Sequence, residues 1–321
     1  MENFWKNKKV LITGADGFIG SHLAARLVEL GAIVHAVVGP RKQSWRLDAL
    51  AGQVTLLDAD LNEVGQVRQL FEEHHPSIVF NTAAINNTEK SLEHAESIIQ
   101  NTYGIARNVI EAAARAEVER LVQFGSIEEY GACEAPFVES MREEHFSPYS
   151  LGKVMATQCA LMTARLTPMQ VRIVRPAATY GPAQSFGLLV ARIIKAGLEG
   201  KDFDMNAGEQ LRDFMYVDDV VEGALRAAMH EGAQGEIFNL GNNRAVCVKE
   251  VAQMVNEAMG SPININFGAR PYRPLDSMVF YMNSDKAKRL LDWEPKTSLA
   301  DGIKKTVAWY QEHWQERGAY K

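Results

Sequence analysis

The sequence predicts an α/β protein, built on a doubly wound parallel sheet with a second, smaller α/β portion. In the first half of the chain, short apolar runs alternate with segments whose apolar residues recur at helical spacing. A glycine-rich segment joins the first apolar run to the first helical segment. The chain of 321 residues, 46% hydrophobic and 23% charged, suits a globular protein of one large domain or two modest ones.

The first half supplies the strands and helices of the predicted sheet. The expected strands are Lys9–Thr13, Ala32–Val38, Val54–Leu57, Ser77–Asn81, Arg120–Phe124 and Val171–Val174. The expected helices are Ile19–Leu30, Val64–His74, Ala95–Arg115 and Ser147–Leu166. Gly31 follows the first helix, where a glycine commonly ends one. Because strand–helix–strand connections are right-handed crossovers, these strands should form a parallel sheet.

The second half is less regular. Periodicity predicts a strand over Ile237–Leu240 and helices over Leu188–Leu198, Val217–Met229, Val248–Met259, Ser284–Leu291 and Leu299–Gln315. We expect residues 1–176 to form the sheet domain, with residues 213–242 returning to it. Residues 177–212 and 243–321 should form the smaller portion, which closes over the sheet.

Composition argues against several classes of protein. A net charge of −6 does not suit a general nucleic-acid binder, which needs a basic surface. Cys133, Cys159 and Cys247 have no metal or disulfide spacing, and unpaired thiols suit a reducing cytoplasm. No apolar run approaches the ~18 residues of a membrane span, and the first residues lack a signal-peptide pattern. We expect a cytoplasmic protein with no metal, nucleic-acid or membrane partner.

The segment Thr13–Gly20 (TGADGFIG) predicts a dinucleotide-binding turn. It follows a predicted strand and opens a predicted helix, which is the context that the pattern requires. Gly14 permits a tight turn, Gly17 lets the backbone approach a pyrophosphate, and Gly20 lets the helix pack closely on the sheet. Free N–H groups around Phe18–Ile19, at the helix N-terminus, attract the anion. Residues 1–176 are therefore predicted to be a Rossmann domain that binds a nicotinamide dinucleotide for redox chemistry.

The end of the second predicted strand indicates which dinucleotide is preferred. An NAD-binding protein commonly has an acidic residue about 20 positions beyond the turn. Gly39 stands there instead, and Arg41 and Lys42 follow it. A missing carboxylate with cations nearby suits a 2′-phosphate, so we predict NADP(H) as the preferred cofactor and NAD(H) as possible. The alternative is that Arg41 and Lys42 are ordinary loop charges.

Tyr149 and Lys153 are candidate catalytic residues. They lie four residues apart at the start of a predicted helix, and so share one face of it. A nearby ammonium and an oxidised nicotinamide would stabilise a tyrosinate and lower its pKa from ~10 toward neutrality. Ser126, in the preceding loop, would hydrogen-bond a substrate oxygen.

Together these motifs resemble the extended branch of the short-chain dehydrogenase/reductase superfamily. The likeness covers nearly the whole chain and includes Arg175–Pro182 (RPAATYGP) and Arg212–Asp219 (RDFMYVDD). It is similar in particular to the NAD(P)-dependent nucleotide-sugar epimerases, dehydratases and reductases. The resemblance implies an enzyme acting on a nucleotide-diphosphate sugar, with Ser126, Tyr149 and Lys153 as its Ser/Thr-Tyr-Lys set.

The resemblance also implies further cofactor contacts. Asp60, with Leu61 beside it, follows the third strand, where the family contacts the adenine ring. Ala83, after the fourth strand, is small and lets the backbone approach the cofactor. Tyr149 and Lys153 would contact the nicotinamide ribose as well as the substrate.

Substrate contacts are implied in the same way. Arg212 is a candidate ligand of the diphosphate, because guanidinium groups bind phosphate oxygens in bidentate fashion. Arg270 and Arg273, in a loop of the smaller portion, are further candidates, with ordinary surface charge as the alternative. Asn87 and Gln184 are candidates for contact with the substrate.

The loop after the fifth strand bears on the reaction. Family dehydratases place an acidic or hydroxyl residue between Ser/Thr and Glu, but this chain has Ile127 before Glu128, and isoleucine cannot transfer a proton. The loop, with Gly181–Gly187 (GPAQSFG), is closer to 4-ketoreductases that make deoxyhexoses. Ala178 replaces the family asparagine, which puts one substrate contact in doubt.

We therefore predict 4-ketoreduction of a nucleotide-linked 4-keto-6-deoxyhexose, with Glu128 contacting a sugar hydroxyl. A 4-epimerase or a 4,6-dehydratase with recycled cofactor is the first alternative. A non-catalytic dinucleotide-sensing protein on the same fold is a remote one.

Two helices favour a homodimer. In the resembled family, helices matching Ala95–Arg115 and Ser147–Leu166 pair with their copies in a four-helix bundle. Here they carry more apolar residues than one sheet face needs, namely Ile98, Ile105, Met155, Cys159 and Met162. Ordinary core packing is the alternative.

Overall fold

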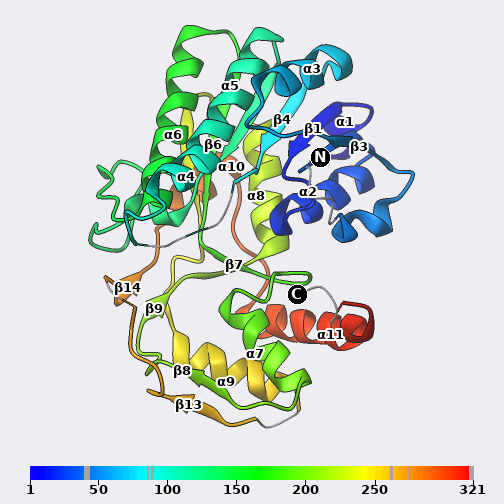
Figure 1. Ribbon diagram of the computed structural model, residues 1–321. Coiled ribbons are helices and arrows are strands. Elements are labelled where there is room, and N and C mark those ends of the chain that lie inside the picture. Colours follow the sequence, from blue (N-terminus) through cyan, green and yellow to red (C-terminus); the bar gives the residue numbers. More distant parts are fainter. Residues whose placement is uncertain (40–43, 85–86, 88–89, 261–262, 274, 318–321) are drawn as a thin grey trace.

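The central element is a seven-stranded parallel sheet with the strand order β11-β6-β5-β4-β1-β2-β3 (Figure 1). The computed structural model describes residues 1–39, 44–84, 87, 90–260, 263–273 and 275–317. The strands are β1 Lys9–Thr13, β2 Ile33–Val38, β3 Val54–Asp58, β4 Ile78–Asn81, β5 Arg120–Phe124, β6 Gln170–Pro176 and β11 Glu236–Leu240. The predicted doubly wound α/β fold is confirmed.

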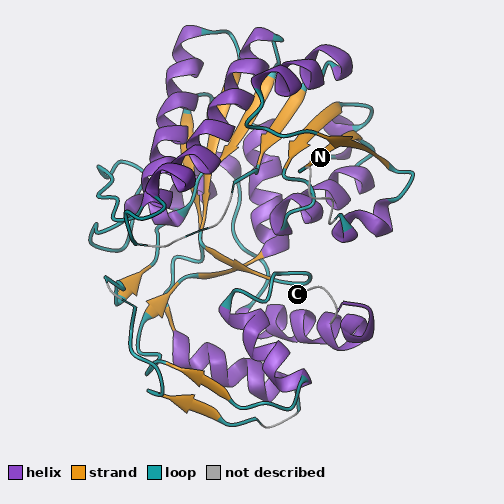
Figure 2. Ribbon diagram, in the orientation of Figure 1, coloured by secondary structure: helices purple, strands orange, loops and turns teal. Residues whose placement is uncertain are grey.

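Helices cover both faces of the sheet (Figure 2). One face packs against α3 (Val64–His74), α5 (Ile105–Arg115) and α6 (Pro148–Leu166) around residues such as Phe71 and Val109. The other face packs against α2 (Phe18–Glu29) and α8 (Val217–Met229). The apolar runs of the strands are buried because both faces are covered.

Local chemistry explains where the helices begin and end. Gly31 has φ +78°, so it ends α2 in the left-handed region as predicted. The Ser147 hydroxyl accepts the backbone N–H of Ser150 at 3.0 Å and begins α6. The predicted helix Ala95–Arg115 is instead α4 (Ala95–Ile99), a π-helical turn η2 (Gln100–Gly104) and α5.

A smaller portion lies beside the carboxyl ends of the strands (Figure 1). Its helices are α7 (Leu189–Leu198), α9 (Val248–Ala258) and α11 (Leu299–Arg317), which share a core that includes Ile194 and Val255. Its short strand pairs were not predicted, because two- and three-residue strands show no periodicity. They are β7 (Ala178–Tyr180) with β10 (Phe214–Tyr216), β8 (Phe203–Met205) with β13 (Ile265–Phe267), and β9 (Leu211–Arg212) between β12 (Val246–Cys247) and β14 (Val279–Phe280).

Residues 213–242 supply both β10 of the smaller pairs and α8 and β11 of the sheet layers. Helix α10 (Asp285–Leu291) contacts both β11 and α8. The assignment of 1–176 and 213–242 to the dinucleotide, and of 177–212 and 243–321 to the substrate, stays a prediction.

Over the described part of the chain, no helix is both long and apolar enough to cross a membrane. Within the same residues, no group of three or more His, Cys, Asp or Glu side chains has a metal-binding arrangement. The three cysteines are free thiols.

Candidate active site

The glycine-rich turn leaves an open cradle at the carboxyl end of β1. A Cβ atom on Gly14 (φ +64°) would lie 2.9 Å from the Cα of Ala83, and one on Gly20 would lie 2.2 Å from the Gly14 carbonyl oxygen. Gly17 is the N-cap of α2, and no side chain caps this helix. Its first N–H groups therefore remain available to an anion, which suits a dinucleotide pyrophosphate.

A buried polar ladder forms the floor under this cradle. The Thr13 hydroxyl donates to Asn81 Oδ1 at 2.6 Å, and Asn81 Nδ2 donates to Gln123 Oε1 at 2.8 Å. The Thr13 hydroxyl also accepts the backbone N–H of Ala83 at 3.3 Å. These bonds join the ends of β1, β4 and β5, next to the point where the strand order reverses and where ligands bind in such sheets.

The other predicted cofactor residues lie along the same edge. Phe18 and Ile19 are half-buried in the first turn of α2. Asp60 follows β3, where its carboxylate accepts the backbone N–H of Asn62 at 2.9 Å, and Leu61 beside it is buried. Gly39 is exposed at the end of β2, whereas Arg41 and Lys42 lie outside the described residues.

Arg46 is a cation beside the turn that sequence reasoning missed. It lies in the short helix η1 (Trp45–Leu50). Its Nη1 donates to the Asp16 carbonyl at 3.0 Å, and its Nε donates to the Ala183 carbonyl at 2.9 Å. No motif marks Arg46, because only the folding of η1 against the turn brings it there.

Ser126, Tyr149 and Lys153 come together at the end of β5. The Ser126 side chain lies beside that of Tyr149 and favours its ionised form. Lys153 Nζ donates to the Phe124 carbonyl at 2.8 Å and lies 5.9 Å from the Tyr149 ring centre. Tyr149 and Lys153 are both buried, with exposed fractions of 7% and 5%.

Burial controls the protonation of this group. It raises the pKa of Tyr149 well above its ordinary value, and the charge of Glu128 raises it further, against the hydrogen bond from Ser126. Burial also lowers the pKa of Lys153 to about 8, against the opposing charge of Glu129. Tyr149 is therefore a proton donor in this state, and a cation bound beside it would bring its pKa down.

The two residues that follow Ser126 lie in different surroundings. Ile127 begins the short helix η3 (Ile127–Tyr130) and is 6% exposed within the core of the sheet domain. Burial raises the pKa of Glu128, against the charges of Lys90 and Arg212. Ile127 therefore lies in the apolar core, whereas Glu128 lies near the charges of Lys90, Arg212 and Asp276.

Arginine and lysine side chains gather where the smaller portion meets the sheet. This cation cluster consists of Lys90, Arg192, Arg212, Arg270 and Arg273. Burial lowers the pKa of Arg192, and the charges of Arg270 and Arg273 lower it further. Burial likewise lowers the pKa of Lys90, and the charges of Arg212 and Arg273 lower it further, against the larger opposing charges of Glu128 and Asp276. Such a cluster suits a diphosphate. Sequence reasoning missed Arg192 and Lys90, since neither stands in a motif.

Arg212 is held in place by an acid of the smaller portion. Its Nη2 lies 2.7 Å from Asp276 Oδ1, and Gln210 donates to Asp276 Oδ2 at 3.0 Å. Burial lowers the pKa of Arg212, against the charge of Asp276.

The remaining predicted substrate residues lie in nearby loops. Asn87 is half-buried in the loop after β4. Gln184 is 4% exposed and donates to the Thr179 carbonyl at 2.6 Å, while its Oε1 has no partner within the described chain. Ala178, in β7, is exposed at the position of the family asparagine.

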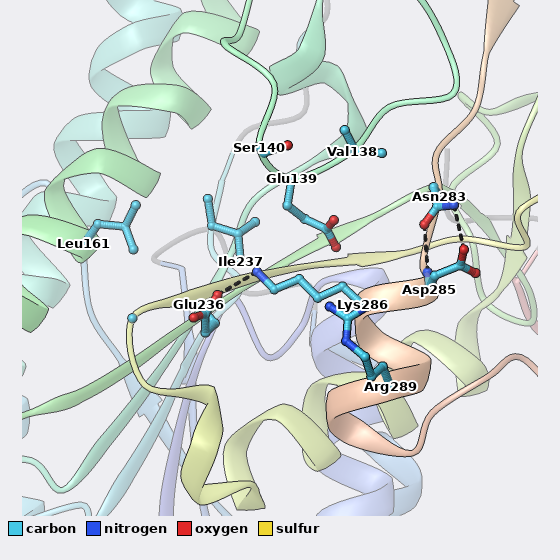
Figure 3. Close-up of a pocket in the computed structure, with 11 residues that line it drawn as sticks. Val138, Glu139, Ser140, Leu161, Glu236, Ile237, Asn283, Asp285, Lys286 and Arg289 are labelled. Atoms are coloured by element: carbon cyan, nitrogen blue, oxygen red, sulfur yellow. Dashed lines mark hydrogen bonds and ion pairs between the residues drawn. The ribbon is translucent and has the colours of Figure 1, made fainter.

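A separate pocket of about 530 Å³ lies at the free edge of β11, against α10 (Figure 3). Glu139, Ile237, Lys286 and Arg289 are among its lining residues, and Lys286 pairs there with Glu236 at 2.6 Å. None of the predicted site residues lines this pocket.

The model of the NAD dependent epimerase/dehydratase family matches residues 10–241. The chain belongs to this family. The match spans the glycine-rich turn, Ser126, Tyr149 and Lys153, and most of the sheet. This epimerase/dehydratase-family chain is therefore an enzyme of the nucleotide-sugar epimerase, dehydratase and reductase class, as the extended short-chain resemblance implied.

Individual relatives of this family member carry out different reactions. The chain is 30% identical to a UDP-N-acetyl-alpha-D-glucosaminuronate decarboxylase of Bacillus cytotoxicus, covering 95% of this chain and 98% of the relative. It is 28% identical to a dTDP-4-dehydro-6-deoxy-D-allose reductase of a Streptomyces species, with 96% and 98% covered. The solved structure of MoeE5 in complex with UDP-glucose and NAD is similar at a TM-score of 0.86 and 29% identity, with 95% and 99% covered.

Proposed function

We propose that the enzyme reduces the 4-keto group of a nucleotide-linked 4-keto-6-deoxyhexose. The observation that carries this proposal is the arrangement around Ser126. Ser126 lies beside Tyr149, and Lys153 Nζ lies 5.9 Å from the Tyr149 ring centre, while the Ile127 side chain is buried in the core. This arrangement supplies one proton donor at the reacting carbon but no acid–base partner at position 127 for the removal of water.

The side chains divide the work as follows. The bound dinucleotide supplies the hydride. Ser126 donates a hydrogen bond to the carbonyl oxygen and orients it, and Tyr149 gives its proton to the oxygen as it becomes an alkoxide. Lys153 lies 5.9 Å from the Tyr149 ring centre; it would hold the hydroxyls of the nicotinamide ribose and favour the tyrosinate that results. Glu128 accepts a hydrogen bond from a sugar hydroxyl.

The diphosphate of the substrate would bind the cation cluster. Arg192, Arg212 and Arg273 come from three segments of the smaller portion, and in this proposal each would donate to the diphosphate. Lys90 supplies charge from the sheet domain. On this view residues 177–212 and 243–321 bind the substrate, and residues 1–176 and 213–242 bind the dinucleotide.

NADP(H) is the cofactor that we propose, with NAD(H) as the alternative. Support comes from Gly39, which offers no carboxylate to a ribose 2′-hydroxyl, and from Arg46 against the turn. MoeE5 was solved with NAD, so the comparison supports the alternative. A thermal-shift comparison decides: greater stabilisation by NAD⁺ than by NADP⁺ would refute the preference.

A 4-epimerase or 4,6-dehydratase is the second candidate, since the family contains both and Glu128 is retained. These enzymes recycle their cofactor, whereas a reductase consumes it. The test incubates the purified enzyme with NADPH and dTDP-4-keto-6-deoxyglucose, the probe used. Oxidation of NADPH in proportion to sugar product supports reduction. Stoichiometric NAD(H) that survives dialysis, with no consumption of NADPH, supports the second candidate.

A homodimer through α4–α5 and α6 is also proposed. Ile98 and Ile105 are buried within the chain, at 5% and 8% exposure, so they pack in its own core. Met162 and Leu166 on α6 are 52% and 73% exposed and support the interface. Light scattering tests it: a monomeric mass for the wild-type enzyme refutes the dimer.

A further inference from the structure

Glu129 is a fully buried carboxylate close to the catalytic candidates Ser126, Tyr149 and Lys153. Its Oε1 accepts the backbone N–H of Ser126 at 2.9 Å, and its Oε2 accepts the hydroxyl of Thr157 at 2.8 Å. Thr157 follows Lys153 by one turn of α6. A single carboxylate thus joins the loop that carries Ser126 to the helix that carries Tyr149 and Lys153.

Arg175, from β6, balances this buried charge. Its Nε and Nη2 donate to Glu129 Oε2 at 3.0 and 2.7 Å, and Nη2 also donates to Glu143 at 2.6 Å. Its guanidinium lies 4.7 Å over the ring centre of Tyr130. Buried ion pairs seldom add net stability, because desolvation offsets their attraction. A role in geometry explains the pair better than a role in stability.

Gly125 shows how closely the Glu129 carboxylate is fitted. A Cβ atom at Gly125 would lie 2.1 Å from Glu129 Oε1 and 3.1 Å from Arg175 Cγ. The carboxylate therefore occupies the space that any other residue would fill at position 125. From this space the Glu129 carboxylate contacts both Ser126 and Thr157 of α6.

We propose that Glu129 is a positioning residue for catalysis. Together with Arg175 it holds the main chain of Ser126 and the Tyr149–Lys153 turn of α6 at the spacing that proton transfer needs. The inference rests on the proposed function of Ser126 and Tyr149. Because the diphosphate would be bound by the separate cation cluster, loss of this spacing should lower kcat and leave KM nearly unchanged.

The charge of Glu129 gives the proposal a second readout. After burial and the charge of Glu128, and against the hydrogen bond from Ser126, Glu129 raises the pKa of Tyr149. Lys153 is the cation on the same helix, and Glu128 in turn faces Lys90, Arg212 and Asp276. Removal of the negative charge at position 129 therefore lowers the pKa of Tyr149. The alkaline limb of reductase activity, where Tyr149 loses its proton, should move to lower pH.

The test uses Glu129→Gln and the double variant Glu129→Leu/Arg175→Met. The first removes the charge but keeps an oxygen that accepts the Ser126 N–H. The second replaces the ion pair by apolar side chains of similar volume, which buried sites commonly tolerate. Glu139→Gln is the matched control, since Glu139 accepts the backbone N–H of Asn239 at 2.9 Å in the pocket of Figure 3.

We expect Glu129→Gln to lose about tenfold in kcat, with KM within about twofold and the alkaline limb at lower pH. The folded double variant should lose about a hundredfold in kcat. Glu139→Gln should match the wild type in both respects. Wild-type kcat in the double variant, or an unmoved limb in Glu129→Gln, overturns the proposal.

A substrate-independent measurement separates this inference from the proposed function. The ionisation of Tyr149 is followed by ultraviolet difference titration of the NADP⁺ complex, with Tyr149→Phe as the reference. If the wild type fails to reduce the sugar, the proposed function falls, and the titration still decides the role of Glu129. A Tyr149 that ionises at lower pH in Glu129→Gln supports the positioning role, and an unchanged Tyr149 refutes it.

Discussion

At the scale of single residues, burial determines the chemistry of the site. Tyr149 and Lys153 are ordinary titrating groups in the sequence, but in the folded protein both are buried close to Ser126. Burial pushes both groups toward their neutral forms, so Tyr149 holds a proton to give, and the pKa of Lys153 falls to about 8. Lys153 therefore titrates close to physiological pH, whereas Tyr149 keeps its proton there.

Removal of the Tyr149 hydroxyl tests this pair directly. In Tyr149→Phe, kcat with the 4-keto sugar should fall by about 10²- to 10⁴-fold, because the proton donor is lost. Binding of the dinucleotide, measured by fluorescence titration, should change little. Tyr103→Phe serves as the control, since Tyr103 lies in the π-helical turn η2. Unchanged turnover in Tyr149→Phe would remove the catalytic assignment.

The glycines of the turn make a second prediction at this scale. A Cβ at Gly20 would lie 2.2 Å from the Gly14 carbonyl oxygen, so Gly20→Ala must displace the cradle. Its affinity for the dinucleotide should fall at least about tenfold, measured by calorimetry. Gly65, in α3, has open space around it, so Gly65→Ala should retain affinity and stabilise the protein by about 0.5–1 kcal/mol. Wild-type affinity in Gly20→Ala would contradict the close fit.

At the scale of elements, the two ends of the sheet carry different kinds of side chain. The carboxyl ends of β1, β4 and β5 hold the polar ladder and Ser126. Toward the opposite end, β5 and β6 bury Arg120 and Arg172. Arg120 is satisfied by the Ala228 carbonyl and by Glu231, at 2.9 and 2.6 Å. Arg172 is satisfied only in part: its Nη2 donates to Gln170 and to the His230 carbonyl, but its Nε and Nη1 have no partner among the described residues.

This contrast predicts opposite effects of the same substitution. Burial, followed by the charge of Arg120, lowers the pKa of Arg172 to about 10, so its charge is poorly compensated. Arg172→Met should leave the free energy of unfolding unchanged or raise it by about 1 kcal/mol. Arg120→Met should lower it by about 2 kcal/mol or more, because it leaves the backbone carbonyls of Ala228 and Met229 without the donor that Arg120 supplies. Urea denaturation of both variants measures the difference, and a large loss in Arg172→Met would contradict this account.

At the scale of the whole molecule, a few buried contacts join the sheet domain to the smaller portion. Asp213 lies between β9 and β10 and accepts the backbone N–H of Asn242, just after β11, at 3.0 Å. Arg46 spans from the glycine-rich turn to Ala183. Trp45 stacks on Trp309 of α11 with ring centres 6.4 Å apart. These contacts help to fix how the smaller portion lies against the sheet domain.

Asp213 makes the stability of this junction depend on pH. Burial, against hydrogen bonds from Asn242, raises the pKa of Asp213 to about 7 from its ordinary value of 3.8. The folded state therefore binds more protons between those values, and the group destabilises the fold increasingly as pH rises through this window. Asp213→Asn removes this cost. The difference in Tm between Asp213→Asn and the wild type should increase from pH 5 to pH 8. The increase should be equivalent to more than about 1 kcal/mol of stability. A difference in Tm that does not vary with pH would refute the shift.

The sequence by itself determined the fold class and most element bounds, and it predicted residues for the site. Helix and strand periods follow from burial of one face, so the span Val64–His74 matches α3 at both ends. The glycines of the turn and the Tyr149–Lys153 spacing are local patterns, and local patterns can be recognised in the sequence. Only the tertiary structure decided which side chains from distant segments meet. Arg46 and Arg192 lie in no motif, and the short pairs β7–β10 and β8–β13 show no periodicity. Glu129 lies in the loop after the fifth strand, but the local sequence does not show that it contacts Ser126, Thr157 and Arg175. Their placement depends on long-range packing and burial, which bring together residues up to about 140 positions apart and set the pKa of each.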